Sequence, residues 1–599
     1  MSADLPTVWD LSPLLVSDTD PKLPELLDEI AQSAQRFVAN WKERRDYLFE
    51  PNVLAQALDE YERLQRQFGT SGTPGYYFML RAAQDQDNAS VKAQSGKLTE
   101  FATRLGNELQ FFELNLATVA PDLQKEFLSS DTLLAYRHWL ERIFAQAKHR
   151  LSEPEERLLN LKYPSSKGHW KELTSSLHSA EERELELADD SRHLLSFERI
   201  SKLMLDRNKR VRDAAALSFN EILSRHLKVS EAEINALLGD KKVEDELRGF
   251  ERPESSRHQS DDIPTETVDA MTAAVSARFD LPRRYYQLKA RLFHVDRLSY
   301  HERNVEFGSL EKNYAYTDAL ALVRRALAKL DPQFADILDK LAAEGQIDVY
   351  PKPNKRGGAF CAYNLLSQPT YVMLNHTDRL GDVLTLAHEL GHAINDELMR
   401  QGQNALNFGT SLATAEVAST FMEDFVVQEL LEDADADVRL SLSMLRLDRD
   451  VSTIFRQVAI YRFEQDLHRV FRKRGFVSKE AIGKLFSARM GEYMGDGVSL
   501  DLGSENWWTY IGHIRNYFYV YSYASGELIS KSLQAMVRND PKNIALVKRF
   551  LAAGTSKSPK ETFEELGIDM ADPSFWIKGL TEVERRLKET ESLAGILNV

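Results

Sequence analysis

The chain contains little cysteine, proline or glycine. Its 599 residues include 1 Cys, 19 Pro and 28 Gly. With Cys361 alone no internal disulfide can form, so secretion is not indicated. Cys361 also lies in a segment expected to be a strand, which argues against a catalytic thiol. Sparse Pro and Gly leave room for long helices, and the sequence shows no clean repeat and no low-complexity linker.

Long apolar runs and excess positive charge are also absent. No run of eighteen apolar residues occurs, and Met1–Pro6 opens no basic region followed by an apolar core, so neither a membrane span nor a signal peptide is expected. The net charge of −16 gives little support for nucleic-acid or membrane partners. We expect a cytoplasmic globular protein, whose oligomeric state the sequence does not set.

One pentapeptide carries most of the chemical information. His388-Glu389-Leu390-Gly391-His392 lies in residues 378–402, where apolar residues recur at helical spacing. Two histidines four residues apart share one helix face and can bind one metal ion, while Glu389 can reach a water on that metal. Gly391 disfavours helix and indicates close approach by another group. The usual metal at such a site is zinc, so the motif predicts a zinc hydrolase, most often a peptidase.

The third ligand is predicted from its distance downstream. A metzincin has a His six residues after the second one, but that position is Leu398. A Glu about twenty residues on, as in thermolysin-like sites, is also missing, because those positions are Ser411 and Leu412. Glu397 is on the same helix and turned away from the pair. Glu416 is therefore the predicted ligand.

Glu416 lies in Thr410–Leu431, a second segment predicted to be helical from its Thr/Ser start. Glu423 is two turns further along the same face, and Ser419 lies between the two glutamates. Either Ser419 or Glu423 could orient a histidine ligand by a hydrogen bond, although a solvated acid is the ordinary alternative for Glu423.

Helical periodicity dominates the rest of the chain and predicts a large, mainly α fold. Two weak breaks interrupt it, at Tyr163–Gly168 and at Arg248–Asp262. We therefore predict an N-terminal helical region at 1–165 and a metallopeptidase region at 166–599, arranged as two lobes around a cleft. The longest amphipathic segments are Leu54–Phe68, Ala93–Leu116, Thr132–Ala147, Ile263–Phe293 and Tyr316–Leu341.

A small β-sheet is predicted directly before the zinc helix. Three short β-branched or aromatic segments are separated by Pro and Gly within Gln346–His376: 346–350, 359–363 and 370–374. A sheet edge beside a peptidase site commonly holds substrate by strand addition, and Gly357 and Gly358 would allow close approach. An ordinary structural hairpin is the alternative.

The motif and its surroundings resemble the oligoendopeptidase F branch of the thimet-type oligopeptidases. The resemblance runs in order along nearly the whole chain. Its segments are Val8–Leu14, Lys355–Cys361 with Asn375, Thr385–Ala393, Ala415–Glu423 and Asn516–Gly526. It implies a helical peptidase with a deep channel that excludes folded proteins and admits short peptides.

The resemblance also implies roles at matching positions. His388, His392 and Glu416 would bind one Zn²⁺ per chain, and Glu389 would be the general base. His513 and Tyr521 fall where the family steadies the oxyanion and the peptide.

The sequence departs from the family at two places near these residues. The family often has a His where this chain has Asn395, and Phe-Tyr where it has Ile514-Arg515. The Asn at position 395 suggests that the residues around the metal ligands differ from those of the family. The second difference leaves open which tyrosine acts and which subsites the enzyme prefers.

The downstream tyrosines have two possible interpretations, as core packing or as catalytic and substrate-binding groups. His513, Tyr517 and Tyr521 are spaced by four and would share one face of a helix, although Gly512 allows a loop at its start. Such a stripe is more often core packing than chemistry. For His513 and Tyr521 the resemblance favours a catalytic role over core packing. Tyr517 and Tyr519 are left as candidate substrate contacts, and Gly358 is a further candidate, in the predicted sheet region.

Three functions remain open from the sequence. The leading one is a zinc endopeptidase, in which Glu389 takes the proton of a zinc-bound water as the water attacks a peptide carbonyl. A zinc carboxypeptidase or dipeptidyl carboxypeptidase would need a cation such as Arg515 for the substrate carboxylate. A metal-holding peptide-binding protein is the third, although a structural site needs no general base. Cobalt or manganese could also occupy these ligands.

Overall fold

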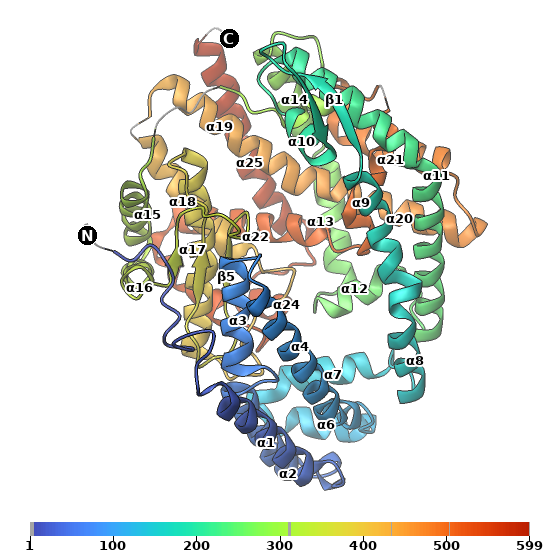
Figure 1. Cartoon of the computed structure of the whole chain (residues 1–599), viewed down its shortest axis with the longest axis vertical. Helices are drawn as coiled ribbons and strands as arrows, with labels where there is room; N and C mark the ends of the chain where they lie inside the picture. The colour runs from blue at the N-terminus through green and yellow to red at the C-terminus, as the bar shows by residue number, and fades with distance from the viewer. Residues whose placement is uncertain (1–4, 309–312, 433, 502, 598–599) are drawn as a thin grey trace. The chain divides into compact units, whose positions relative to one another are not determined.

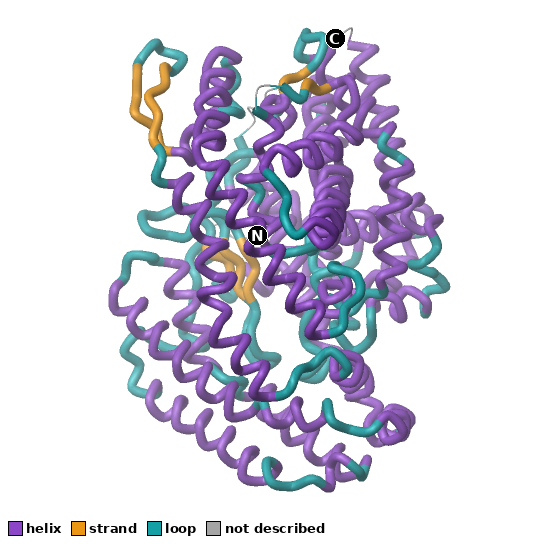
Figure 2. The backbone as a smooth tube through the Cα atoms, turned by 90° about the vertical axis from the view of Figure 1, so that its right-hand side faces the viewer, coloured by secondary structure: helices purple, strands orange, loops and turns teal. Residues whose placement is uncertain are grey.

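Helices make up almost all of the regular structure. The computed structural model describes residues 5–308, 313–432, 434–501 and 503–597. Within these ranges strands are short and few, as the orange segments among purple helices in Figure 2 show. The prediction of a mainly α fold with a small sheet is confirmed.

The chain divides into two compact units, each built from three separate stretches of sequence. Unit 1 comprises Met1–Lys148, Glu311–Asp433 and Met536–Ile568. Unit 2 comprises His149–Leu310, Ala434–Ala535 and Asp569–Val599. This grouping differs from the linear division at 165/166 expected from the sequence, because segments far apart in the chain share one core.

Unit 1 contains the motif helix and the sheet before it (Figure 1). Its strands are β4 Ile347–Asp348, β5 Phe360–Ala362 and β6 Tyr371–Met373. Its helices are α1 Leu23–Trp41, α2 Pro51–Gln67, α3 Gly72–Gln84, α4 Ala89–Leu109, α5 Phe111–Leu116, α6 Pro121–Ser129, α7 Arg137–Ala147, α15 Tyr316–Leu330, α16 Pro332–Ala343, α17 Leu380–Gly402, α18 Val417–Glu432, α23 Ile544–Ala552 and α24 Pro559–Glu564, with short turns η1 Asp46–Leu48, η2 Asp131–Tyr136 and η9 Pro541–Asn543.

Unit 2 contains the longest helix, α11, and two small strand pairs. The strands are β1 Glu182–Glu186, β2 Arg192–Ser196, β3 Leu298–Ser299 and β7 Val498–Ser499. The helices are α8 Glu153–Tyr163, α9 His169–Ser179, α10 Phe197–Leu203, α11 Lys209–Arg248, α12 Ser255–Ser260, α13 Thr265–Ala277, α14 Asp280–Leu292, α19 Ala436–Asp450, α20 Arg456–Arg474, α21 Lys479–Met494 and α25 Pro573–Leu597. The short helical turns are η3 Pro164–Gly168, η4 Tyr300–Asn304, η5 Val451–Phe455, η6 Gly495–Gly497, η7 Ser504–Thr509 and η8 Gly512–Arg515. Helix α22, Tyr521–Asn539, begins in the residues of unit 2 and ends in those of unit 1.

Most of the long predicted helices are divided in the structure. Leu54–Phe68 forms one helix, α2, as predicted. Tyr316–Leu341 is instead split into α15 and α16, because Asp331 caps α16 by accepting the N–H of Gln333 (2.9 Å) and Pro332 occupies its first position. The same kind of interruption gives η2 with α7, α4 with α5, and α13 with α14.

The predicted sheet is present, with shorter strands. The strand order is β4-β6-β5, parallel between β4 and β6 and antiparallel between β6 and β5. Lys355 ties the connecting loop to the sheet by donating to Asp348 Oδ1 (2.7 Å) and to the carbonyl of Leu374 (2.6 Å). In the part of the chain that the structure describes, β5 pairs only with β6, so it is an edge strand beside α17.

The beginning of the chain packs against this sheet. Trp9 Nε1 donates to the carbonyl of Val372 (2.8 Å), and Tyr76 hydroxyl donates to the carbonyl of Ala362 (2.7 Å). Both aromatic side chains belong to a buried apolar cluster that also contains β6 residues. Residues near the N-terminus therefore help to hold the sheet that leads into the motif helix.

Gly391 sets how closely α17 and α18 pack. A Cβ at this position would lie 2.5 Å from Cα of Ser419 and 2.8 Å from the carbonyl oxygen of Ala418. Real side chains do not make such contacts, so only glycine permits this spacing. The close approach predicted from Gly391 is confirmed.

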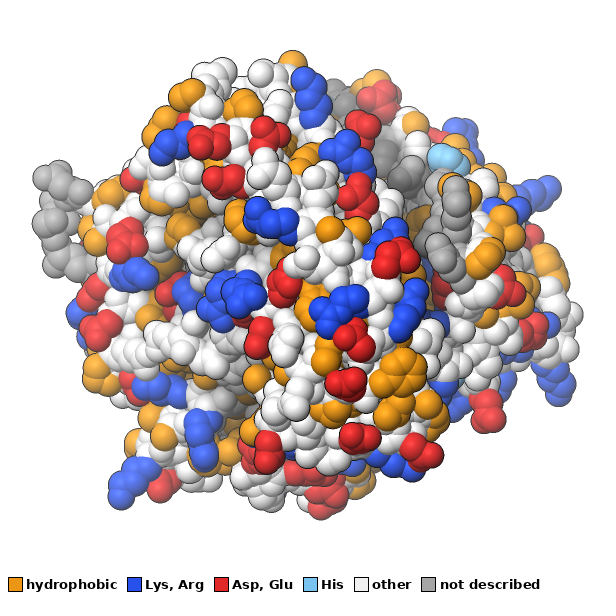
Figure 3. All heavy atoms as spheres, turned by 90° about the horizontal axis from the view of Figure 1, so that it is seen from below, with side chains coloured by type: hydrophobic (Ala, Val, Ile, Leu, Met, Phe, Trp, Pro, Cys, Tyr) orange, Lys and Arg blue, Asp and Glu red, His pale blue; other side chains and the backbone are white. Residues whose placement is uncertain are grey.

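The described surface carries both signs of charge. On the face shown in Figure 3, acidic and basic side chains are interspersed, with apolar side chains scattered between them. Across the described ranges, no helix is long and apolar enough to cross a membrane.

Candidate active site

Helix α17 presents both motif histidines on one face. The helix starts where the Asp382 carboxylate accepts the N–H groups of Thr377 (2.7 Å) and Arg379 (3.0 Å). One turn separates His388 from His392, and their ring centroids are 5.0 Å apart. The predicted helix at 378–402 is confirmed to within two residues at its start.

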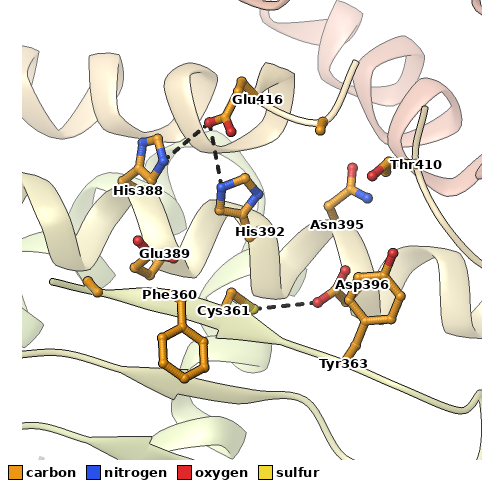
Figure 4. Close-up of a pocket in the computed structure, with 12 residues that line it drawn as sticks. Phe360, Cys361, Tyr363, His388, Glu389, His392, Asn395, Asp396, Thr410 and Glu416 are labelled. Carbon is orange, nitrogen blue, oxygen red and sulfur yellow. Dashed lines mark hydrogen bonds and ion pairs between the residues drawn. The ribbon is translucent and has the colours of Figure 1, made fainter. Parts of the chain in front are cut away.

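Glu416 meets these histidines from the opposite segment. Its Oε2 lies 3.3 Å from Nε2 of His388 and 3.7 Å from Nε2 of His392 (Figure 4). The predicted helical segment at 410–431 was too long, since α18 begins only at Val417. Glu416 therefore lies in the turn before the helix, where its carboxylate accepts the hydroxyl of Ser419 (3.2 Å).

The three side chains fit a divalent metal. One ligand atom from each of His388, His392 and Glu416 lies within 4.8 Å of the others. Burial lowers the pKa of His392 to about 4, and the hydrogen bond from His388 lowers the pKa of Glu416 to about 2. Neutral imidazole and ionised carboxylate are the forms that bind metal, so the donor set suits zinc.

Glu423 contacts the far side of one histidine. Its Oε2 lies 3.3 Å from Nδ1 of His388. A carboxylate at that nitrogen fixes which ring nitrogen carries the proton and leaves Nε2 for a metal. The contact is the one that the predicted orienting role of Glu423 needs, and the role itself stays a prediction.

Glu389 lies on the same helix, pointing between the histidines and strand β5 (Figure 4). It is 7% exposed. Burial raises the pKa of its carboxyl to about 7, with His388 opposing the rise and Glu416 adding to it. A carboxyl with a pKa near neutrality can exchange a proton at physiological pH.

His388, His392, Glu389 and Glu416 line one pocket of about 350 Å³ in unit 1. Strand β5 and the loop after it form one wall, and α17 with the turn before α18 forms the other. The lining residues are Ala359, Phe360, Cys361, Tyr363, His388, Glu389, His392, Asn395, Asp396, Thr410, Ala415 and Glu416.

The downstream histidine and tyrosines lie in unit 2 and do not share one helix face. Residues 512–515 form the short turn η8, Tyr517 has a positive φ of 51°, and α22 starts at Tyr521. The structure therefore takes the loop alternative. His513 Nδ1 pairs with the hydroxyl of Tyr519.

Two of the predicted tyrosines have buried hydroxyl groups. Tyr521 donates to Asp261 (2.8 Å), and Tyr517 donates to the carbonyl of Leu237 (2.9 Å). Tyr517 is thus buried within unit 2 in this structure, and its contact with substrate stays a prediction. Tyr519 and His513 remain partly exposed.

Arg515 and Gly358 also have definite places. Arg515 is 5% exposed and pairs through two nitrogens with Glu233, at 2.7 and 2.8 Å. It is therefore occupied as an internal ion pair. Gly358 is exposed, has φ 77° and has its carbonyl held by Asn375 (2.6 Å), so its glycine serves a backbone conformation that other residues rarely adopt.

Sequence reasoning missed several residues that the fold brings to these sites. Tyr363, Asp396 and Thr410 line the pocket, yet nothing in their spacing marks them. Tyr523 forms an aromatic cluster with His513 and Tyr519, with ring centroids 5.9 and 5.8 Å away. The only available signal was position: Asp396 is one helical turn beyond a histidine of the motif.

A helical scaffold with a His-Glu-x-x-His helix, a converging third carboxylate and a buried glutamate defines a metal-dependent hydrolase. Comparison with known proteins agrees with this class. The model of Peptidase family M3 matches residues 202–582, and the model of Oligopeptidase F matches residues 116–180. The Peptidase family M3 match covers more than half of this chain, so the chain belongs to peptidase family M3.

Individual relatives are distant and cover most of the chain. An oligoendopeptidase F homolog of Lactococcus lactis is 24% identical over 86% of this chain and 86% of its own length. Oligopeptidase PepF of Bacillus subtilis is 24% identical over 98% of this chain and 87% of its own length. A crystal structure from Chlamydophila abortus, 22% identical, superposes with a TM-score of 0.84 over 98% of both chains, which supports the fold.

Proposed function

We propose that the chain is a zinc-dependent endopeptidase that hydrolyses internal bonds of short, unstructured peptides. Membership of family M3 and the named relatives support endopeptidase action on oligopeptides. The observation that carries the residue assignment is the convergence of His388, His392 and Glu416 beside the buried Glu389.

His388, His392 and Glu416 would hold one zinc ion per chain. When bound, zinc polarises the peptide carbonyl and makes water more acidic. Glu423 would keep the His388 ring in place from behind, and Ser419 would do the same for the Glu416 carboxylate through its 3.2 Å hydrogen bond.

Glu389 would act as the general base. Its carboxylate takes a proton as water attacks the substrate carbonyl, and the same group can deliver that proton to the leaving amine. Strand β5 lines the same pocket, and Glu389 is buried there.

His513 with a neighbouring tyrosine would donate hydrogen bonds to the developing oxyanion. Burial lowers the pKa of His513, with Arg456 adding to the effect. Tyr521, assigned this role by resemblance, has its hydroxyl on Asp261, whereas Tyr519 is partly exposed and already contacts His513. We therefore place Tyr519 beside Tyr521 as the tyrosine to test.

The carboxypeptidase alternative loses its sequence support. It requires a cation for the substrate's terminal carboxylate, and the candidate was Arg515. In the structure the guanidinium is buried against Glu233 and two backbone carbonyls, Ile511 and Thr509. An internal ion pair of this kind is costly to break, so Arg515 is a poor carboxylate anchor.

Cleavage of matched peptides tests the proposal. Wild type and Glu389→Gln, each loaded with stoichiometric zinc, are given end-blocked and free peptides of about 5 to 20 residues, and products are read by mass spectrometry. We expect internal cuts in blocked peptides, with activity lower by about 10²–10⁴-fold in the variant because the general base is lost.

Three results would decide against the proposal. Cuts that require a free C-terminus would identify a carboxypeptidase. Full activity of metal-loaded Glu389→Gln would remove Glu389 from the chemistry. A metal-loaded wild type that binds peptides without cutting them would favour the peptide-binding alternative.

A further inference from the structure

A second group of polar side chains lies in the same pocket and has no part in the hydrolysis proposed above. We call it the Asp396 subsite. In Figure 4 it lies on the side of His392 away from His388 and Glu389. Its members are Tyr363 after β5, Asn395 and Asp396 on α17, and Thr410 before α18.

Asp396 is a buried acid with no cation paired to it. It is 4% exposed, and within the described chain its carboxylate makes a hydrogen bond only with the thiol of Cys361, at 3.5 Å. Arg400, one turn further along α17, is used elsewhere: it donates to Glu397 (3.0 Å) and to Thr370 (3.0 Å). Burial raises the pKa of Asp396 to about 8. A carboxyl kept in such a place costs stability unless it gains a partner.

Asn395 supplies a second unsatisfied group beside it. The side chain is 6% exposed, and its Nδ2 has no hydrogen-bond partner among the residues that the structure describes. Buried amide groups are nearly always paired, and an exception in a pocket marks a place for a ligand. Asn395 can donate to a peptide carbonyl.

The charges of the pocket identify the missing partner. Its lining contains the carboxyls of Glu389, Asp396 and Glu416 and two imidazoles, with no Lys or Arg. The 2+ charge of a metal ion would be balanced by Glu389 and Glu416. Among the described residues that line the pocket, none offers a positive charge to Asp396, and burial raises the pKa of its carboxyl enough to keep it mostly protonated near neutral pH. A ligand cation beside it would favour its ionised form and pair with it.

We propose that the Asp396 subsite binds the cationic side chain of a lysine or arginine in the peptide substrate and so makes the enzyme prefer basic residues near the scissile bond. The inference rests on the proposed function, because it deepens the specificity of the same pocket. Asp396 takes the ammonium or guanidinium group. Tyr363 and Thr410 line the same pocket, the Tyr363 hydroxyl is near Thr410, and burial raises the pKa of Tyr363, with Asp396 adding to the rise.

The position of Asp396 on α17 limits which substrate residue can reach it. Asp396 follows His392 by four residues, which is about 6 Å along a helix axis. An extended peptide advances about 3.5 Å per residue. The selected side chain therefore belongs to a residue within about two positions of the cleaved bond.

End-blocked peptides that differ at one position test the preference. Lysine, arginine, norleucine or glutamate is placed in turn at each of the residues flanking the cut, and kcat/KM is measured for zinc-loaded protein. Norleucine keeps the aliphatic stem of lysine and removes the charge. We expect lysine or arginine to exceed norleucine by about tenfold or more at one position, as for a charge-assisted hydrogen bond.

Two variants on the same helix separate recognition from folding. Asp396→Asn should reduce the ratio of kcat/KM for the lysine peptide to kcat/KM for the norleucine peptide to about 1–2, because the amide keeps the shape of the carboxylate and loses its charge. The matched control is Glu397→Gln, a buried acid at the next position whose carboxylate faces Arg400 and Lys340 and does not line the pocket. It should keep the wild-type ratio. Zinc content and thermal unfolding are measured for each protein, and Asp396→Ser replaces Asp396→Asn if the latter does not fold.

The subsite is refuted if wild type shows no preference for lysine or arginine at any flanking position, or if Asp396→Asn keeps that preference, or if both variants lose it equally. Failure of the proposed function is a separate result, seen as no cleavage of any peptide. In that case binding of fluorescent lysine and norleucine peptides decides: tighter lysine binding that Asp396→Asn abolishes supports the subsite, and equal binding overturns it.

Discussion

At the scale of single residues, the geometry of the proposed metal site depends on the absence of one side chain. Gly391 stands between His388 and His392 in the sequence, and the backbone of Ser419 lies where a Cβ of residue 391 would be. The same contact sets the distance between α17, which carries the histidines, and the turn that carries Glu416. Because glycine has no Cβ, the two segments can approach closely enough for His388, His392 and Glu416 to meet.

Replacing Gly391 with alanine should weaken both packing and metal binding. The added methyl group meets backbone atoms that cannot rotate away, so we expect unfolding free energy to fall by about 1–3 kcal/mol. Displacement of the helices should lower zinc affinity by about 10–100-fold. Competition with a chelator and thermal unfolding measure the two effects.

Gly381→Ala is the matched control. A Cβ at Gly381, in the same helix, would meet nothing within 4 Å. Alanine is the better helix former, by up to about 1 kcal/mol, so stability should hold or rise and zinc affinity should stay the same. A Gly391→Ala protein that binds zinc as tightly as Gly381→Ala would show that the close packing is not needed for the site.

At the scale of elements, the motif helix could be predicted from the sequence, whereas the conformation of the loop after η8 could not. The apolar periodicity around His388 and the cost of Gly391 are local signals, and α17 lies where they place it. Tyr517 and Phe518 adopt φ values of 51° and 58°, which no local preference of these residues favours. Their conformation is imposed from outside the loop, by Leu237 and Glu464, which are far away in the sequence.

We expect Glu464 to make the stability of the structure around this loop depend on pH. Its Oε1 accepts the N–H of Phe518 (3.0 Å), while its Oε2 has no hydrogen-bond partner within the described ranges. Burial raises the pKa of Glu464 to about 8, with the Phe518 hydrogen bond and Arg257 opposing the rise. The folded protein thus holds a proton that the unfolded chain, with its ordinary pKa of 4.5, releases.

The sign of the effect follows from this proton. Between pH 4.5 and about 8 the folded state binds more protons than the unfolded state, so the stability of unit 2 should fall as pH rises, by up to about 1.4 kcal/mol per pH unit. Glu464→Gln is neutral throughout and should remove this slope. The variant should therefore be more stable than wild type at pH 8 and similar to it at pH 5.

Urea unfolding at pH 5.5, 7 and 8.5, followed by tryptophan fluorescence, measures the slope. Glu480→Gln is the control, because Glu480 is exposed and its pKa is lowered by Lys479, so its titration lies below this pH range. Parallel profiles for wild type and Glu464→Gln would mean that Glu464 is ionised in the folded protein.

At the scale of the whole molecule, the sequence predicted the motif and its function better than the grouping of the chain. The candidates His388, His392, Glu389 and Glu416, which the structure brings together, could be predicted because the spacing of histidine and glutamate within and between two adjacent segments is visible in the sequence. The Asp396 subsite could not, because it needs β5 and Thr410 to be brought against α17. The units could not either, since each joins three distant stretches.

This grouping predicts how the protein behaves when it is cut. A fragment of residues 149–599 keeps all three stretches of unit 2 but lacks the first stretch of unit 1. Without Trp9 and Tyr76, β6 and β5 lose their buried aromatic cover and two hydrogen bonds. We expect this fragment to retain a folded unit 2 and to bind zinc at least tenfold more weakly than the full chain, because the sheet and α17 share one core.

Adding the missing piece should restore the site. Residues 1–148 supplied as a separate chain, by coexpression or mixing, can pack on the same sheet without a covalent link, so zinc binding and peptide cleavage should return together. Zinc titration, limited proteolysis and far-ultraviolet circular dichroism follow the two fragments alone and combined. If 149–599 alone binds zinc as tightly as the intact chain, the metal site forms without the first stretch of unit 1, and the linear division near residue 165 describes the folding of this protein better than the discontinuous units do.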